Sequence, residues 1–438
     1  MDATRGLLIA LFLSGCSGYQ FGNVNDASLY GAQCVSQAMN DQFLVKWRTA
    51  VPPEYQKNIL SPGSLITRFP GTTKARVEKE ILQQHLSDYA VAEYEFRITS
   101  TSTSVSGGTN NAPVHTEVTG PTATEGTWGP ADINAQAAWS FLGNEGDGVI
   151  VAVVDSGADI NNPLLSGNIW VNPGEIPNNG IDDEGDGYVD DVNGWDFNAN
   201  QSEVLDEANH GTHVSGIIAG QAGADSFTGV APHAKIMPLK FIDATGSGPI
   251  GDAITAMGYA AAHGAKIINA SWGGSECSSI LGQEIATTAA QGILFVNAAG
   301  NGNAENVGQD ISVAPEWPAS FQIPGKITVG SYNASEVLST FSNFGALVDL
   351  AAPGENILST VPPATGQFEG PNLAIKSGTS MATPFVAGVA ALLYSAKPTA
   401  TAVEIAAAIT GGVQPAGFKV RSAGKLNALG AAQYLMSH

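Results

Sequence analysis

Apolar runs that end in a turn recur along the last two thirds of the chain. The first is GVIVAVVDSG at residues 148–157, and similar runs occupy residues 234–242, 265–274, 292–301 and 347–354. Continuous runs rich in Val and Ile are typical of strands buried on both faces of a parallel sheet. Apolar stretches with helical spacing, such as residues 251–264, lie between some of them. This alternation predicts an α/β fold with parallel strands and right-handed crossovers.

The amino-terminal quarter follows a different pattern. Residues 42–48 (QFLVKWR) suit a strand, and residues 89–98 (YAVAEYEFRI) alternate apolar and polar like a half-buried one. Between them, residues 73–86 show helical spacing with charges of alternating sign. We therefore expect a small α+β unit over residues 42–98. Residues 99–129 lack periodicity and are rich in Ser, Thr, Gly, Pro and Asn, which predicts a flexible linker.

Composition narrows the class of protein. The chain has 438 residues, of which 43% are hydrophobic and 13% are charged, and its net charge is −22. This length accommodates two to three domains of ~100–200 residues, and the composition excludes a disordered chain. The negative charge repels nucleic acid, so we expect no such partner, and it favours cation binding. Three cysteines are too few for a disulfide framework, although Cys34 and Cys277 either pair or remain free thiols.

The amino terminus predicts export from the cytoplasm. Residues 6–16 (GLLIALFLSGC) form an apolar run that is shorter than the ~20 residues of a membrane span and suits a signal peptide. Residues 13–16 (LSGC) resemble a bacterial lipobox, which implies that Cys16 carries a lipid. No other apolar run reaches the length of a span, so a lipid anchor is the only membrane attachment that we expect.

Residues 209–216 (NHGTHVSG) contain two histidines, His210 and His213, for which two roles compete. A zinc pair on a helix has i, i+4 spacing with a glutamate between, whereas here the spacing is three. A histidine that moves a proton needs a nucleophile on one ring nitrogen and a carboxylate on the other. Asp155 ends the first apolar run, and Ser380 opens an apolar helical stretch where a helix dipole favours negative charge. Taken alone, Ser380 predicts only a helix cap.

The three segments VVDSGAD, HGTHVSG and GTSMATP, in this order, resemble the subtilisin-like serine peptidases (subtilases). The order Asp, His, Ser differs from that of the chymotrypsin and α/β-hydrolase types. The resemblance implies a three-layer α/β fold with a mostly parallel central sheet, and an endopeptidase that cleaves extended polypeptides through an acyl-enzyme. It assigns Asp155 as the orienting carboxylate, His210 as the general base and Ser380 as the nucleophile. His213 is left to packing or a backbone contact.

The resemblance also assigns residues that hold the substrate. Asn301 in AAGNGN matches the asparagine whose side-chain amide forms the oxyanion hole together with the backbone N–H of Ser380. Ser271, Trp272 and Gly273 match the edge strand that pairs with an extended substrate. Gly273 and the glycine after it would leave room for the P1 side chain, which belongs to the residue whose carbonyl is attacked.

By the same resemblance, the chain is a precursor. Residues 1–16 form the signal segment, residues 42–98 an inhibitory α+β propeptide domain, residues 99–127 a linker with the processing site, and residues 128–438 the catalytic domain. Self-cleavage in the linker would separate a lipid-anchored propeptide of a bacterial cell envelope from a monomeric catalytic domain that is released to the medium. A surface binding protein without activity and a metallohydrolase are the alternatives from other classes.

Residues 178–197 (NNGIDDEGDGYVDDVNGWDF) are dense in carboxylates, which would repel one another without a cation. Their spacing resembles the first part of an EF-hand loop, with Asn193 in place of the final glutamate. Many subtilases carry similar calcium-binding loops, so we expect structural calcium and no catalytic metal. The predicted ligands are Asp182, Glu184, Asp186 and Asp190, with Asp191 and Asp196 as further candidates.

Overall fold

The computed structural model describes residues 42–60, 64–70, 77, 81, 85, 89–100, 126–222, 227–363 and 372–438. The signal segment, with the predicted lipidation of Cys16, lies outside them, and so do Cys34 and most of the predicted helix over residues 73–86.

A nine-stranded sheet forms the centre of the main domain, in the order β16-β17-β13-β12-β11-β9-β5-β7-β6. All neighbouring strands are parallel except β16 and β17. The strands are β5 (Ile150–Asp155), β6 (Trp195–Asp196), β7 (Lys235–Lys240), β9 (Ile267–Ala270), β11 (Leu294–Ala298), β12 (Lys326–Tyr332), β13 (Leu350–Pro353), β16 (Gln414–Pro415) and β17 (Gly424–Lys425). The prediction of a mostly parallel sheet is confirmed.

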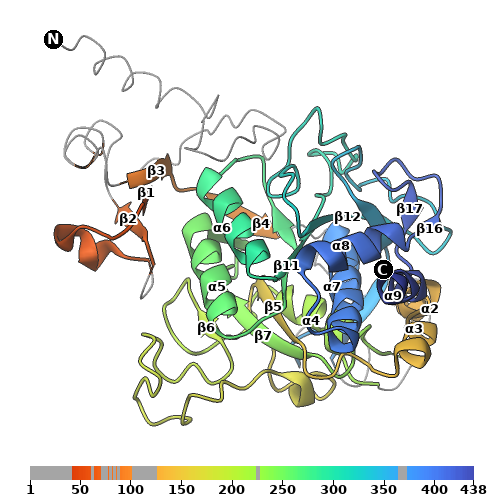
Figure 1. Ribbon diagram of the computed structural model, residues 1–438, viewed down its shortest axis with the longest axis horizontal. Coiled ribbons are helices and arrows are strands. Elements are labelled where there is room, and N and C mark those ends of the chain that lie inside the picture. Colours follow the sequence, from red (N-terminus) through yellow and green to blue (C-terminus); the bar gives the residue numbers. More distant parts are fainter. Residues whose placement is uncertain are drawn as a thin grey trace, which may run out of the picture.

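Helices cover both faces of this sheet (Figure 1). One face packs against α3 (Ala135–Leu142), α4 (Gly211–Ala219), α7 (Thr379–Ala396), α8 (Ala402–Gly411) and α9 (Ala428–Ser437), and the other against α5 (Ile250–Ala262) and α6 (Ser279–Ala290). Each interface holds its own cluster of buried apolar residues, which gives the three layers that the sequence predicts. Among the described helices, α7 has the length and hydropathy of a membrane span, but 89% of it is buried in the fold, as in a core helix.

The strand order reverses at β5. The chain continues from β5 through α4 to β7 on one side, and then through α5 to β9 on the other side of β5. At such a reversal the two connections diverge on opposite faces of the sheet, which leaves a crevice at the carboxyl ends of the strands. Asp155 is the last residue of β5 and therefore lies at this crevice.

Each of the five apolar runs contains a strand, but the run-based prediction misses β12, which lies inside the sheet. Its first residue, Lys326, is buried, and burial lowers the pKa of its amine to about 7. The Nζ of Lys326 donates to Ala319 O at 3.0 Å and to the Thr328 hydroxyl at 2.5 Å. After this lysine, Ile327 and Val329 are each followed by a polar or small residue, so β12 lacks the continuous apolar run from which the other strands are predicted. The sequence also gave no indication of the hairpin of β14 (Ile357–Thr360) and β15 (Leu373–Lys376).

The amino-terminal unit contains an antiparallel sheet in the order β2-β1-β3. Its elements are β1 (Gln42–Trp47), the 3-10 helix η2 (Pro53–Asn58), β2 (Ile66–Pro70) and β3 (Tyr89–Tyr94). A separate core of buried side chains, which includes Phe43, Trp47 and Val77, holds the unit together. The strand predicted over residues 89–98 is divided, because β4 (Arg97–Ser100) leaves this sheet and pairs with the main domain.

Candidate active site

Asp155 and His210 form a buried pair at the carboxyl end of β5. Oδ1 of Asp155 lies 2.7 Å from Nδ1 of His210, and neither side chain is more than 2% exposed. Oδ1 also accepts the backbone N–H of Ser156 at 2.8 Å. Because a carboxylate only accepts, the ring proton of a neutral His210 is on Nδ1 and Nε2 is left as an acceptor. Nε2 has no hydrogen-bond partner among the described residues.

The local sequence fixes where His210 enters α4. His210 is the N-cap residue of this helix, and a Cβ on Gly211 would lie 2.1 Å from Gly157 O, so only glycine fits there. The buried carboxylate of Asp206 accepts from the Ser156 hydroxyl at 2.7 Å, and from the backbone N–H and hydroxyl of Thr212 at 2.8 and 2.7 Å. Burial raises the pKa of Asp206. These contacts hold the start of α4 against the end of β5.

His213 has a structural role, as the sequence predicts. Its Nε2 lies 3.1 Å from Ile357 O and 3.0 Å from Ala374 O, so the ring bridges the hairpin β14–β15. Burial is the main cause that lowers the pKa of His213 well below its usual range, which keeps the ring neutral with its proton on Nε2. Among the described residues, neither His213 nor His210 belongs to a group with metal-ligand geometry.

Ser380 lies in the first turn of α7 and contacts the strand end next to β5. Its hydroxyl donates to Ser271 O at 2.8 Å, and the Ser271 hydroxyl donates to Ser380 O at 2.9 Å. In an uninterrupted helix the N–H of residue 384 would bond to Ser380 O, but Pro384 has no N–H. Because Pro384 cannot donate, the Ser380 carbonyl is available to accept the hydrogen bond from the Ser271 hydroxyl. Since Ser271 follows β9, and β9 pairs with β5, Ser380 and His210 lie over neighbouring strand ends.

The side chain of Asn301 is oriented by the start of α7. Its Oδ1 accepts the backbone N–H and the hydroxyl of Thr379, both at 2.9 Å. Because a backbone N–H is always a donor, this atom is the amide oxygen, and Nδ2 is on the opposite side. The N–H groups at the start of α7 add positive potential beside the Ser380 hydroxyl.

A strand from the amino-terminal part of the chain pairs with the segment that follows Ser271. β4 lies between β10 (Trp272–Gly273) and β8 (Ser247–Pro249), antiparallel to both. Thr99 is opposite Gly273 and Ser100 is opposite Trp272, so the chain runs along β10 towards Ser271. Trp272 donates from its indole to Val154 O at 2.7 Å, which ties β10 to β5. The sequence predicts that Thr99 and Ser100 begin the linker, but in the structure they are the last two residues of β4.

Two carboxylates of the amino-terminal unit cap helices of the main domain. Glu93 accepts the backbone N–H and the hydroxyl of Ser279 at the start of α6, at 3.0 and 2.8 Å. Glu95 accepts the N–H of Gly251 at the start of α5, at 3.1 Å. Arg68 donates to Glu95 at 2.7 and 2.5 Å and to Asp252 at 2.7 Å. Helix N-termini attract negative charge, so these contacts hold the unit against α5 and α6.

The acidic loop forms two groups whose side-chain atoms lie within 4.8 Å of one another. The predicted ligands Asp182 and Glu184 join Glu175, and Glu184 and Asp186 join Asp191 and His263. Glu175 and His263 were not predicted, because they lie outside the segment in sequence. Burial is the main cause that raises the pKa of Asp186 and of Asp191.

The other two predicted carboxylates have backbone partners. Asp190 accepts the N–H groups of Asn179 and Gly180, both at 3.0 Å. Asp196 accepts those of Asn198 and Ala199, at 2.9 and 3.0 Å. Neither carboxylate belongs to the two acidic groups.

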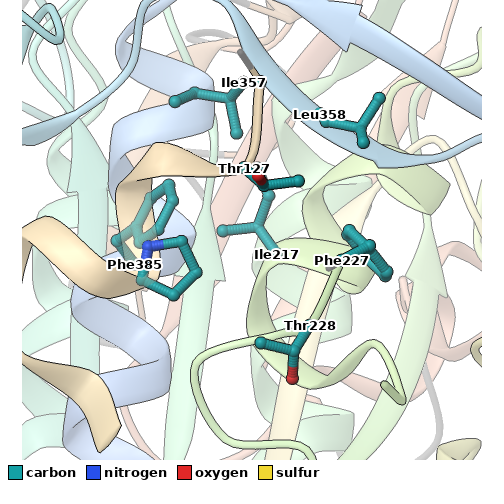
Figure 2. A pocket seen from close by; sticks show the side chains of 9 residues that line it. Thr127, Ile217, Phe227, Thr228, Ile357, Leu358 and Phe385 are labelled. Atoms are coloured by element: carbon teal, nitrogen blue, oxygen red, sulfur yellow. The ribbon is translucent and has the colours of Figure 1, made fainter. Parts of the chain in front are cut away.

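A small cavity elsewhere is a packing gap. It lies beneath Thr127 and is lined mainly by apolar side chains, including Ile217, Phe227, Leu358 and Phe385 (Figure 2). Its volume of about 10 Å³ leaves room for no more than about one water molecule, so it cannot hold a substrate side chain. It does not contain Asp155, His210 or Ser380, so it is not the catalytic crevice.

A strand-end carboxylate hydrogen-bonded to a buried histidine, with a serine over the neighbouring strand end, is the arrangement expected of serine peptidases. The family comparison then identifies the branch: residues 146–423 match the model of the subtilase family. The chain belongs to this family and is a subtilisin-like serine endopeptidase, which acts on polypeptides.

Comparisons with individual relatives support this family assignment. The chain is 35% identical to thermitase of Thermoactinomyces vulgaris over 308 residues, which cover 70% of this chain and 96% of thermitase. It is 34% identical to subtilisin E of Bacillus subtilis (strain 168) over 283 residues, which cover 64% of this chain and 63% of subtilisin E. Fervidolysin from Fervidobacterium pennivorans, a keratinolytic enzyme related to subtilisin, has a similar fold, with a TM-score of 0.69 and 23% identity over 90% of this chain and 61% of that chain.

The contact between Ser271 and Ser380 O predicts a dependence on Pro384. In a Ser380→Ala background, which keeps the carbonyl and prevents self-digestion, Ser271→Ala should cost about 1–3 kcal/mol in urea unfolding, because a buried carbonyl loses its donor. With Pro384→Ala the helix supplies its own N–H, so the same change should cost less. An equal cost in both backgrounds would show that the two donors are not alternatives.

Proposed function

We propose that this chain is the exported precursor of an endopeptidase in which Asp155, His210 and Ser380 perform the reaction. The observation that carries the proposal is the buried hydrogen bond from Nδ1 of His210 to Asp155, which leaves Nε2 as the base. In catalysis the Ser380 hydroxyl turns from Ser271 O to this nitrogen, gives up its proton, and attacks the substrate carbonyl. The imidazolium is stabilised by Asp155 and then protonates the leaving amine.

The oxyanion and the substrate backbone are held by groups on either side of Ser380. Nδ2 of Asn301 and the N–H of Ser380 donate to the oxygen that becomes negative, and the helix dipole of α7 adds to this stabilisation. An extended substrate pairs with Ser271, Trp272 and Gly273 on one side and with β8 on the other, as β4 does. Water then hydrolyses the acyl-enzyme, with His210 as the base again.

Neither alternative class accounts for this arrangement. An inactive binding protein has no need of a buried carboxylate–histidine pair beside a serine, because burying such groups is costly. A metallohydrolase needs metal ligands at the crevice, and among the described residues the candidate groups lie in the acidic loop.

The amino-terminal unit fits the role of an inhibitor. Its last strand fills the groove in which a substrate would pair, and Glu93 and Glu95 anchor it to α6 and α5. Since β4 runs towards Ser271 and Ser380 Oγ is 2.8 Å from Ser271 O, a bond one or two residues beyond Ser100 is the one that Ser380 would cut. We propose that self-cleavage occurs there, at the start of the predicted segment 99–127.

Replacing the nucleophile tests the central proposal. Ser380→Ala should abolish hydrolysis of casein, labelling by a fluorophosphonate, and conversion of the precursor to a shorter chain, because all three need Oγ. Ser335→Ala, which changes an exposed serine on another loop, serves as the control. Persistent labelling or processing of the Ser380→Ala chain would contradict the assignment.

The location of the mature enzyme depends on a disulfide bond. Cys277 is disulfide-bonded, so it is not the free thiol that was one of the sequence-based alternatives. The other cysteines of the chain, Cys16 and Cys34, precede the proposed cleavage site. With a lipid on Cys16, Cys34 is the partner that remains, and disulfides form outside the cytoplasm. We therefore propose that after cleavage the disulfide bond still links the catalytic domain to the lipid-anchored fragment. Release of the domain to the medium, which the sequence predicts, would then also require reduction of this bond.

Gel electrophoresis with and without reductant tests this tether. The processed protein should run as one species without reductant and as two with it, and sequencing of the larger fragment should place its amino terminus within two residues of Ser102. Cys34→Ser should let the catalytic domain leave the membrane fraction, whereas the wild type stays. Separation of the wild-type fragments without reductant would contradict the tether.

Calcium is the cofactor that we propose for the acidic loop. Glu175, Asp182 and Glu184 offer only oxygen atoms, which calcium prefers. In the neighbouring group, Oδ2 of Asp186 is buried without a hydrogen bond and lies 3.1 Å from Nε2 of His263. Bound calcium would neutralise the repulsion between these carboxylates and stabilise the folded loop. We expect it to be structural, and the reaction to need no catalytic metal.

Chelation tests the calcium proposal through stability. In a Ser380→Ala background, excess chelator should lower Tm by about 5 °C or more, because loss of a ligand present at 100 times its Kd removes about 2.7 kcal/mol. Asp182→Asn should lower Tm in calcium and abolish the response to chelator. Glu203→Gln removes an exposed carboxylate outside both groups and should leave the response intact. A Tm of the parent chain that is independent of calcium would contradict the site.

A further inference from the structure

One carboxylate beside the proposed substrate groove has no partner in the described part of the chain. Glu316 precedes Trp317, whose backbone pairs with Gly274 directly after β10. The backbone N–H of Glu316 donates to the Ser320 hydroxyl at 3.1 Å, and its carbonyl accepts from Ser320 N at 2.7 Å. Its carboxylate makes no hydrogen bond or ion pair with any described residue, although the side chain is partly buried. None of the roles proposed above for the residues of the active site involves this carboxylate.

The side chain of Glu316 lies between two glycines that border the groove. A Cβ on Gly273, in the substrate-pairing strand, would lie 3.3 Å from Oε1 of Glu316. A Cβ on Gly300, next to the oxyanion residue Asn301, would lie 3.1 Å from Cγ of Glu316. The carboxylate therefore lies beside both the strand that holds the substrate backbone and the segment that holds its reacting carbonyl.

A P1 side chain has to pass between these two segments. In the proposed groove the attacked carbonyl lies between Ser380 and Asn301, and the neighbouring backbone pairs with Gly273, so the P1 side chain runs between the segments of Gly273 and Gly300. The group that it meets there is the carboxylate of Glu316. A Lys or Arg side chain would bring a cation to this unpaired acid, whereas an apolar side chain would leave it desolvated and unpaired.

We propose that Glu316 is the specificity-determining residue of the P1 pocket and that the enzyme prefers Lys and Arg at P1. This inference rests on the proposed substrate groove and goes beyond it by naming the substrate class. It replaces the tolerance for apolar P1 residues that is the usual expectation for this family.

The ionisation of Glu316 gives the preference a pH dependence. Burial is the cause that raises the pKa of Glu316 to about 7, and no charged group of β10, β11 or the segment 316–320 contributes to this shift. Below pH 7 the acid is largely neutral and binds a cation weakly, and above pH 7 it is charged. The preference for a basic P1 residue should therefore increase as pH rises through 7.

The proposed self-cleavage does not use this charge. Residues 99–127 contain neither Lys nor Arg, so whichever bond is cut there presents a P1 residue without a strong cation. A segment already docked in the groove has a high effective concentration and does not need a favourable P1 residue. Processing of the precursor is thus a measure of the catalytic machinery that is independent of Glu316.

Paired substrates test the proposal. Peptides that differ only at P1, Lys against Met, have side chains of similar length, and their kcat/KM ratio cancels the ionisation of the catalytic groups. The wild type should favour Lys at pH 8, and Glu316→Gln should lower the ratio at least about tenfold, as the loss of one close charge pair predicts. Glu316→Asp should retain part of the preference. The wild-type ratio should fall between pH 8 and pH 6, and the ratio for Glu316→Gln should stay constant.

Controls separate this inference from the proposed function. Glu305→Gln makes the same change of charge at an exposed position of the neighbouring loop and should keep the wild-type ratio, which excludes a general effect of net charge. Precursor processing and fluorophosphonate labelling should persist in Glu305→Gln, and their absence in the wild type would refute the proposed function instead. A wild-type ratio near one, or an equal ratio in Glu316→Gln, would overturn the role of Glu316.

Discussion

The hydrogen bond between Asp155 and His210 is the interaction on which the rest of the site depends. A buried carboxylate costs several kcal/mol unless it is hydrogen-bonded or paired, and here the partners come from the strand end and from α4. The reversal of strand order at β5 creates the crevice, and the glycine after His210 lets α4 approach the strand end. The roles that we propose for Ser380 and Asn301 depend on this pair, because without a base the Ser380 hydroxyl is a weak nucleophile.

Much of this arrangement could be predicted from the sequence, because it depends on local patterns. Buried parallel strands are continuous apolar runs, and the side chains that follow them must gather at one edge of the sheet. Asp155 and the strands before Ser271 and Asn301 were predicted in this way. The strand β12 (KITVGSY) was missed because a polar or small residue follows each of its first two apolar residues, although every residue of the strand is buried.

Contacts between distant segments could not be predicted, for a physical reason. The spacing of carboxylates within residues 178–197 indicated a cation site, but His263 joins it only because the loop folds back onto the end of α5. Asp190 has the right spacing and is instead held by backbone N–H groups. Likewise, nothing near Glu93 in the sequence indicates the start of α6, and nothing near Glu316 indicates Gly273. Such contacts are set by packing.

Reciprocal hydrogen bonds between Ser271 and Ser380 join the start of the proposed substrate-pairing strand to the proposed nucleophile. Each hydroxyl donates to the other residue's backbone carbonyl, and Pro384 leaves one of these carbonyls available. In the proposed reaction the Ser380 hydroxyl gives up its bond to Ser271 O when it turns to His210, whereas the bond from the Ser271 hydroxyl to Ser380 O remains. The start of α7 therefore stays attached to the segment before β10 while the side chain of Ser380 moves.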